Sequence, residues 1–258
     1  MRQPPDTTQL TGLHSATAGD GPAVLLIHPS GVSSVWFEPA VEQLSERWQV
    51  VSYDRPGWGR SAAPDDYRRT SIAEQSITAA GVLRELDISG ARVLGAGFGA
   101  VVALELALAE PDLVKSLVLV EPPLYDTLAG ATEGMSEDVA AIRDAASDGG
   151  QEAVWALFLD GGLPTLGAGA ERFARFASAA GPAAPHTLLV ELPAVPAWPL
   201  DPVRIASLAT EITVATTPSA PEILIEAARS VVSRIPGARG EATAKDGAEA
   251  VSQLLDRV

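Results

Sequence analysis

The stretch VLGAGFGAVVALELA at residues 93–107 decides the fold of this chain. It begins as a short apolar run, passes through a glycine-rich turn at residues 95–99 and continues as alanine and aliphatic residues, a pattern typical of a buried helix. A strand that turns directly into a helix is part of a βαβ unit. The stretch therefore predicts a parallel sheet with crossover helices.

Outward from this stretch, short runs suited to strands alternate with helical patterns along most of the chain. Five runs predict strands buried on both faces, at residues 24–27, 49–52, 91–94, 116–120 and 212–216. Between them, residues 70–86 form an amphipathic pattern that opens with Ser71 and Glu74 at capping-box spacing, and residues 100–109 form another helical pattern. The alternation predicts an α/β fold with a mostly parallel sheet.

Two further motifs precede the glycine-rich turn. LLIHPSG at residues 25–31 runs from a strand into a loop of small residues, and YDRPGWGRS at residues 53–61 is a strand end followed by a second glycine-rich turn. Together with the turn at residues 95–99, they resemble the α/β-hydrolase family, whose chains carry an HG loop, a D-x-x-G-x-G-x-S turn and a G-x-S-x-G nucleophile elbow. The second motif matches at Asp54, Gly57, Gly59 and Ser61.

The resemblance implies a sheet core interrupted by a helical cap. The interval 122–209 breaks the alternation, because it holds helical patterns near residues 137–146, 151–159 and 170–180 with no convincing strand between them. We expect three segments: the first part of the hydrolase-type core at 1–121, the cap at 122–209 and the last part of the core at 210–258.

Other residues occupy the three catalytic positions that the resemblance implies. Gly97 stands where the elbow of the family has its nucleophilic serine. The loop at 245–249 reads KDGAE, no histidine follows His186, and the loop at 216–221 contains no carboxylate. A nucleophile needs a base, and the base needs an orienting group. We therefore expect that the Ser-His-acid triad is lost and that the protein is not a conventional serine hydrolase.

Loss of the triad leaves three hypotheses for function. The first is a non-hydrolytic, cofactor-free lyase, isomerase or cyclase that acts on a mainly apolar small molecule, with secondary metabolism as one setting. The second is a catalytically silent ligand-binding or regulatory pseudoenzyme. The third is a dinucleotide-binding protein, because GAGFGA at residues 95–100 fits G-x-G-x-x-A and Glu121 ends the next strand.

Two titratable residues are the candidate catalytic acid/base groups. His28 occupies the position of the HG-loop histidine of the family, where tethering of the loop is the alternative role. Glu121 ends the strand that follows the elbow. Burial there raises the pKa of a carboxyl group and suits it to act as a base, and capping of the next turn is the alternative.

The remaining pocket candidates lie in loops and in the expected cap. Backbone N–H groups for a developing negative charge come from Phe98, after Gly97, and from Ser30 or Gly31, because Pro29 has no N–H. The other candidate pocket residues, each with a structural role as its alternative, are Trp36, Trp155, Phe158, His186, Trp198, Ser219 and Asp246.

The amino-acid composition disfavours several classes of binding partner. The 258 residues carry 18 basic and 33 acidic side chains, a net charge of −15 that disfavours nucleic acid and anionic membranes. There is no cysteine, and only three histidines are present, so no metal site is expected. The opening residues do not resemble a secretion signal. We expect a cytoplasmic protein with a small apolar ligand or substrate and no cofactor; a homodimer is left open.

Overall fold

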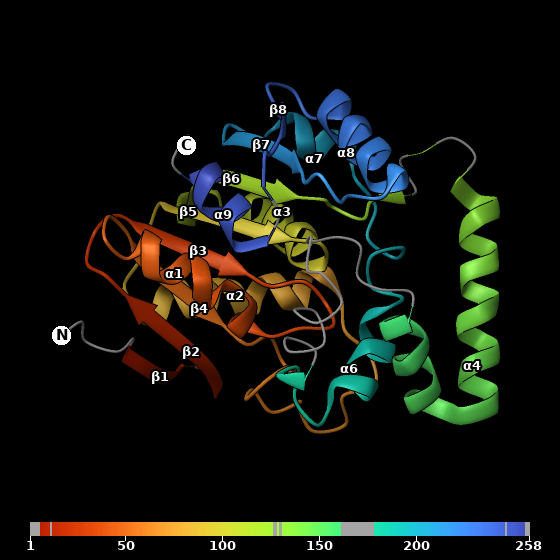
Figure 1. Cartoon of the computed structure of the whole chain (residues 1–258). Helices are drawn as coiled ribbons and strands as arrows, with labels where there is room; N and C mark the ends of the chain where they lie inside the picture. Colours follow the sequence, from red (N-terminus) through yellow and green to blue (C-terminus); the bar gives the residue numbers. More distant parts are fainter. Residues whose placement is uncertain are drawn as a thin grey trace.

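The computed structural model describes residues 6–10, 12–125, 128, 131–160, 178–245 and 247–255. Within them the strands form one sheet in the order β1-β2-β4-β3-β5-β6-β7-β8, in which β3 to β8 are parallel and β1 and β2 are antiparallel (Figure 1). The strands are β1 (Asp6–Leu10), β2 (Leu13–Ala18), β3 (Ala23–Ile27), β4 (Gln49–Tyr53), β5 (Ala91–Ala96), β6 (Val114–Val120), β7 (Glu211–Thr216) and β8 (Arg239–Ala242). The predicted α/β fold with a mostly parallel sheet is confirmed.

Helices cover both faces of the sheet. Helices α2 (Ile72–Glu85), α3 (Phe98–Ala109) and α8 (Glu222–Arg234) pack on one face, and α1 (Glu38–Leu44) and α9 (Gly247–Leu255) pack on the other. Short 3-10 turns precede α1 (Ser34–Phe37) and β6 (Pro111–Leu113). Ser71 caps α2 as the capping-box spacing predicts, because its Oγ accepts the Glu74 N–H at 3.1 Å. Ser71 Oγ also donates to the Glu74 carboxylate at 3.0 Å.

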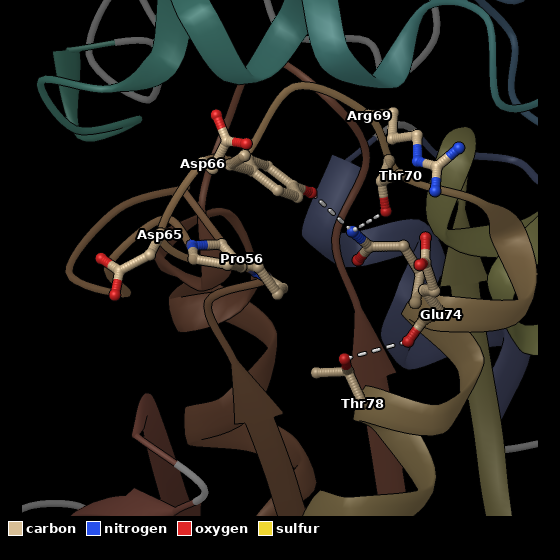
Figure 2. Close-up of a pocket in the computed structure, with 10 residues that line it drawn as sticks. Pro56, Asp65, Asp66, Arg69, Thr70, Glu74 and Thr78 are labelled. Carbon is tan, nitrogen blue, oxygen red and sulfur yellow. Dashed lines mark hydrogen bonds between the residues drawn. The ribbon is translucent and has the colours of Figure 1, made fainter.

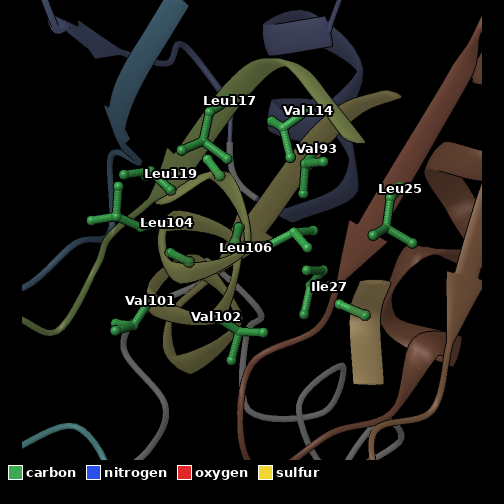
Figure 3. Packing of buried hydrophobic residues seen from close by; sticks show 14 of the residues in the cluster. Leu25, Ile27, Val93, Val101, Val102, Leu104, Leu106, Val114, Leu117 and Leu119 are labelled. Atoms are coloured by element: carbon green, nitrogen blue, oxygen red, sulfur yellow. The ribbon is translucent and has the colours of Figure 1, made fainter. Parts of the chain in front are cut away.

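Successive strand residues point to opposite faces, which explains why the strand sequences are apolar throughout. On β3, Leu25 and Ile27 join the cluster around α3, which Figure 3 shows, whereas Val24 and Leu26 join the cluster beneath α1 and α9. Helix α3 is itself buried almost all round, in agreement with its apolar sequence. The elbow sequence therefore enters the centre of the core.

The described residues between β6 and β7 are helical or in turns. They include α4 (Ala131–Asp160), which is interrupted at Gly150, α6 (Ala184–Glu191) and α7 (Pro202–Ala206). Helix α4 stands apart from the sheet and packs with α6 around a separate apolar cluster that includes Trp58, Val154 and Leu188 (Figure 1). The cap boundaries at 122 and 209 stay a prediction, and the helix expected at 170–180 falls largely outside the described residues.

Strand β1 was not indicated by sequence patterns. Its sequence, DTTQL, is mostly polar, and it pairs only with β2 at the edge of the sheet. An edge strand needs less apolar character than a central one. Across the described ranges, no helix has both the length and the hydropathy that a bilayer crossing demands. The cytoplasmic location stays a prediction.

Candidate active site

The glycine-rich turn between β5 and α3 lies at the carboxyl end of the parallel strands. Gly97 has φ 53° and ψ −123°, and its N–H donates to the Val120 carbonyl at 2.9 Å. A Cβ placed on Gly97 would lie 3.0 Å from Cβ of Pro29. The HPSG loop, residues 28–31, therefore lies directly over the turn. The backbone conformation and this close approach both favour glycine.

Helix α3 begins at Phe98, immediately after Gly97. The first N–H groups of a helix have no acceptor within the helix, and the helix dipole places partial positive charge there. The turn is therefore suited to hold a negatively charged oxygen, the role expected for the Phe98 N–H. Ser30 and Gly31 follow Pro29 in the loop that faces this turn.

His28 is completely buried, and both of its ring nitrogens contact the backbone. Its Nδ1 lies 2.7 Å from the Pro29 carbonyl, and its Nε2 accepts the N–H of Arg55 at 3.0 Å. Burial lowers the pKa of His28 well below its ordinary value, and the nearby Arg55 lowers it further. This geometry fits the tethering alternative; the catalytic role of His28 stays a prediction.

Glu121 directly follows β6 and is also completely buried. Its φ is 49°, a left-handed conformation that a side chain with a Cβ rarely adopts. Its Oε1 accepts the Thr217 N–H at 2.9 Å and the Thr217 hydroxyl at 2.6 Å, which connects the ends of β6 and β7. A buried carboxylate in strained backbone beside the elbow is the kind of outlier that accumulates at functional sites.

A buried cluster around Glu191 was not indicated by the sequence. Arg55 forms a bidentate ion pair with Glu191, and both side chains are at most 1% exposed. Trp58 Nε1 donates to Glu191 Oε1 at 2.8 Å, and Ser30 Oγ donates to Oε2 at 2.5 Å. Arg55 also lies 4.5 Å above the Phe98 ring. The cluster thus joins α6 to the HPSG loop and to the start of α3.

The YDRPGWGRS turn is braced by Asp54, as its motif predicts. The Asp54 carboxylate accepts the Ser34 N–H at 2.9 Å and hydroxyl at 2.5 Å, together with the Arg60 N–H at 2.9 Å. Gly57 in the same turn has φ 80°, and a Cβ there would lie 2.3 Å from the Thr187 hydroxyl oxygen of α6. Glycine thus lets α6 approach the turn.

The predicted aromatic pocket residues lie in different places. Trp36 packs against Phe37 in the core beneath α1, and the Trp198 indole donates to Glu105 of α3 at 2.8 Å. Trp155 and Phe158 instead stack in the cluster on α4, and Trp155 lies 6.2 Å from the Trp58 ring. Only this second group adjoins the Glu191 cluster; the pocket roles of all four stay predictions.

The last three candidate pocket residues are His186, Ser219 and Asp246. His186 Nε2 contacts the Tyr67 carbonyl at 2.5 Å, on the β4–α2 loop, and Ser219 lies exposed after β7. Asp246 lies outside the described residues. The apolar pocket expected between core and cap stays a prediction.

A separate pocket of about 370 Å³ lies between the β4–α2 loop and the start of α2. Figure 2 shows that Asp65 and Arg69 stand at its edges and extend away from each other, with Pro56 and Thr78 on opposite sides. Its lining includes no residue of the elbow or of the HPSG loop. Among the residues described, no cluster of histidine, aspartate and glutamate side chains could hold a metal ion.

A family model described as the Alpha/beta hydrolase family matches residues 24–247. The protein named "Putative carbamate hydrolase RutD" from Azorhizobium caulinodans is 37% identical over 102 residues, which cover 40% of this chain and 38% of that protein. "Uncharacterized hydrolase YraK" from Bacillus subtilis is 31% identical over 126 residues, 48% of this chain and 46% of that protein. The match spans less than half the length of either relative.

The fold is also found among solved structures. An esterase from Exiguobacterium antarcticum superposes with a TM-score of 0.73 and 18% sequence identity, covering 100% of this chain and 98% of that chain. At this identity the similarity shows the shared fold alone.

The names of the relatives contradict the function expected from the sequence. A non-hydrolytic lyase, isomerase or cyclase, or a silent pseudoenzyme, is the wrong prediction, because the relatives that share sequence with this chain are named hydrolases. The physical reason lies in the nucleophile. The glycine at the elbow position argued against an acyl-enzyme, but a positioned base can still activate water for direct attack.

The alternative prediction of a dinucleotide-binding protein is also wrong. The GAGFGA sequence forms the β5–α3 turn within the matched hydrolase region, after β3 and β4 have already contributed the other two family motifs. Glu121 Oε1 is bound by Thr217 rather than held at the turn for a ribose.

Proposed function

This chain belongs to the alpha/beta hydrolase family, and from this premise we propose that it is a hydrolytic enzyme that attacks a small acyl substrate with water instead of serine. The observation that carries the proposal is the position of Glu121, a buried carboxylate in left-handed backbone at the strand end beside the elbow. In this proposal the Ser-His-acid triad is absent. Gly97 leaves the elbow without a hydroxyl group, and Pro29 stands over the position of the missing Cβ.

The proposed reaction uses two groups of this chain. Glu121 accepts a proton from a water molecule while the water oxygen bonds to the carbonyl carbon of the substrate. The electron pair of the carbonyl moves to its oxygen, which the Phe98 N–H at the start of α3 stabilises. The leaving group then departs with the proton from Glu121, so the carboxylate is regenerated and no covalent enzyme intermediate forms.

The names of the relatives support acyl substrates, because several of them are named as putative carbamate hydrolases. The geometry supports the division of roles. Thr217 fixes Oε1 of Glu121 through two hydrogen bonds, which holds the carboxylate in one orientation.

The test measures hydrolysis of a panel of phenyl esters, carbamates and lactones by wild type and by Glu121→Gln. We expect saturable hydrolysis by wild type and a loss of kcat by about 10²–10⁴ in the variant, the usual contribution of a general base. Intact-protein mass spectrometry during turnover should find no acyl adduct.

The matched control is Glu105→Gln, the same chemical change in another buried carboxylate. Glu105 pairs with Trp198 and Arg204, away from the elbow, so its variant should keep wild-type kcat. An acyl adduct on the protein, or full activity in Glu121→Gln, would overturn the proposal.

A further inference from the structure

The ion pair with Arg55 fixes the direction of the hydrogen bonds around Glu191. Arg55 contacts both carboxylate oxygens, with Nη2 at 3.2 Å from Oε2, and Trp58 donates to Oε1 at 2.8 Å. The guanidinium and the indole only donate, and an ionised carboxylate only accepts. A hydroxyl group in contact with Glu191 must therefore donate its proton to it.

Ser30 is that hydroxyl group. Its Oγ lies 2.5 Å from Glu191 Oε2, the short distance expected of a bond from a hydroxyl to a charged carboxylate. Serine has a single hydroxyl proton and two acceptor lone pairs. With its proton held by Glu191, Ser30 Oγ can only accept from a third group. Ser30 is partly exposed, whereas Glu191 is buried.

The HPSG loop brings this acceptor to the elbow. Ser30 directly follows Pro29, whose side chain lies over Gly97. The same Arg55 that holds Glu191 stacks on the Phe98 ring at 4.5 Å. The N–H donor of Phe98 and the Ser30 acceptor are thus fixed through one buried ion pair. A substrate that bridges them offers a carbonyl oxygen to the first and a hydrogen-bond donor to the second.

We propose that Ser30 is a fixed hydrogen-bond acceptor that selects acyl substrates with an N–H group next to the carbonyl, as in carbamates and primary or secondary amides. The inference rests on the proposed function and names its substrate class. Simple esters and N,N-dialkyl carbamates lack the N–H donor and offer nothing to the acceptor lone pairs of Ser30 Oγ. A site that provides a polar partner discriminates strongly against an analogue that lacks the matching group.

The experiment compares phenyl N-methylcarbamate with phenyl N,N-dimethylcarbamate in wild type and Ser30→Ala. The measured quantity is the ratio of the two kcat/KM values. Dividing the variant ratio by the wild-type ratio removes the intrinsic reactivity difference between the substrates. We expect Ser30→Ala to lower the preference for the N–H substrate about tenfold, and Ser30→Thr, which keeps the hydroxyl, to retain it.

The matched control is Ser34→Ala. Ser34 also donates to a buried carboxylate at 2.5 Å, but that carboxylate belongs to Asp54 in the brace of the β4–α2 turn. Its variant loses the same kind of bond and should keep the wild-type ratio. Binding of methyl carbamate and its N,N-dimethyl analogue is titrated in parallel by NMR, so that recognition is measured without turnover.

The outcomes separate the two proposals. If both carbamates are hydrolysed and the ratio does not respond to Ser30→Ala, the selection by Ser30 is wrong and the hydrolytic function stands. If neither is hydrolysed but the N–H analogue binds better and loses this advantage in Ser30→Ala, the hydrolytic function is wrong and the selection stands. Absence of both hydrolysis and preferential binding overturns both.

Discussion

Two buried glutamates near the elbow differ in the hydrogen bonds that hold their Oε1 atoms. Glu191, at the end of α6, is bound by the cationic Arg55, by Trp58 and by Ser30. At Glu121, after β6, the donors to Oε1 are the neutral amide and hydroxyl of Thr217. A charge-assisted hydrogen bond from a cation to a carboxylate is stronger than a bond from a neutral donor.

We interpret Glu191 as a structural anchor, a residue that holds distant segments together, and Glu121 as the proposed general base. Glu191 connects segments distant in the sequence, since Arg55 lies 136 residues before it, and its strong bonds suit a structural and positioning role. Glu121 connects neighbouring strand ends and occupies strained backbone. If this interpretation is right, substitutions at Glu191 should act mainly on stability, and substitutions around Glu121 should act mainly on turnover.

The largest effect on stability is expected from Glu191→Gln. The variant leaves the Arg55 guanidinium buried without a counter-charge, which typically costs about 3–5 kcal/mol of unfolding free energy. Urea unfolding followed by fluorescence measures the loss. Removal of both charges, in Arg55→Met with Glu191→Leu, should recover most of it, because apolar pairs often replace buried ion pairs well.

Glu105→Gln is the reference variant for the stability loss in Glu191→Gln. Its partner Arg204 is 40% exposed, so water can solvate the guanidinium once the carboxylate is gone. We expect a smaller destabilisation than in Glu191→Gln. Equal losses in the two variants would contradict the interpretation of Glu191 as the anchor between α6 and the core.

A smaller effect on stability is expected from Thr217→Val, which removes the 2.6 Å hydroxyl bond to Glu121 and leaves the backbone bond intact. Loss of one bond to a buried carboxylate costs about 1–3 kcal/mol. Because Glu121 then loses part of its orientation, kcat should fall with little change in KM. Thr243→Val is the control, since the Thr243 hydroxyl bonds only backbone carbonyls of Thr216 and Lys245 in the described contacts. A stability loss without a fall in kcat would make Glu121 a second anchor.

The same contrast explains what sequence could predict. The central strands and α2 and α3 were predictable because periodicity and capping are local, and Glu121 was visible because it directly follows a strand beside the elbow motif. The Glu191 cluster was not predictable, because its members are distant in the sequence: they come from the HPSG loop, the β4–α2 turn and α6. One signal was present: Glu191 is an acid within the otherwise apolar run LLVELPAV at residues 188–195.

The smallest expected effect is on the pH dependence of stability. It tests the contacts of Arg55 with His28. His28 belongs to the Arg55 region, because its Nε2 accepts the Arg55 N–H and its carbonyl accepts Arg55 Nε. Burial lowers the pKa of folded His28 well below the ordinary 6.5, so from pH 6.5 downward the unfolded chain binds a proton that the folded chain does not. The stability that His28 contributes is therefore complete above pH 6.5 and falls as the pH drops below it.

One fully shifted histidine gives a slope of up to about 1.4 kcal/mol per pH unit. Other groups also titrate in acid, so the informative quantity is the difference in slope between wild type and His28→Gln from pH 7.5 to 5.0, measured by urea unfolding. His14→Gln serves as the comparison. The pKa of His14 is also lowered, mainly by burial, but His14 is less enclosed, and its variant should change the slope less. If His28→Gln leaves the slope unchanged, His28 takes up protons in the folded protein as readily as in the unfolded chain. In that case a neutral His28 ring does not connect the HPSG loop to Arg55.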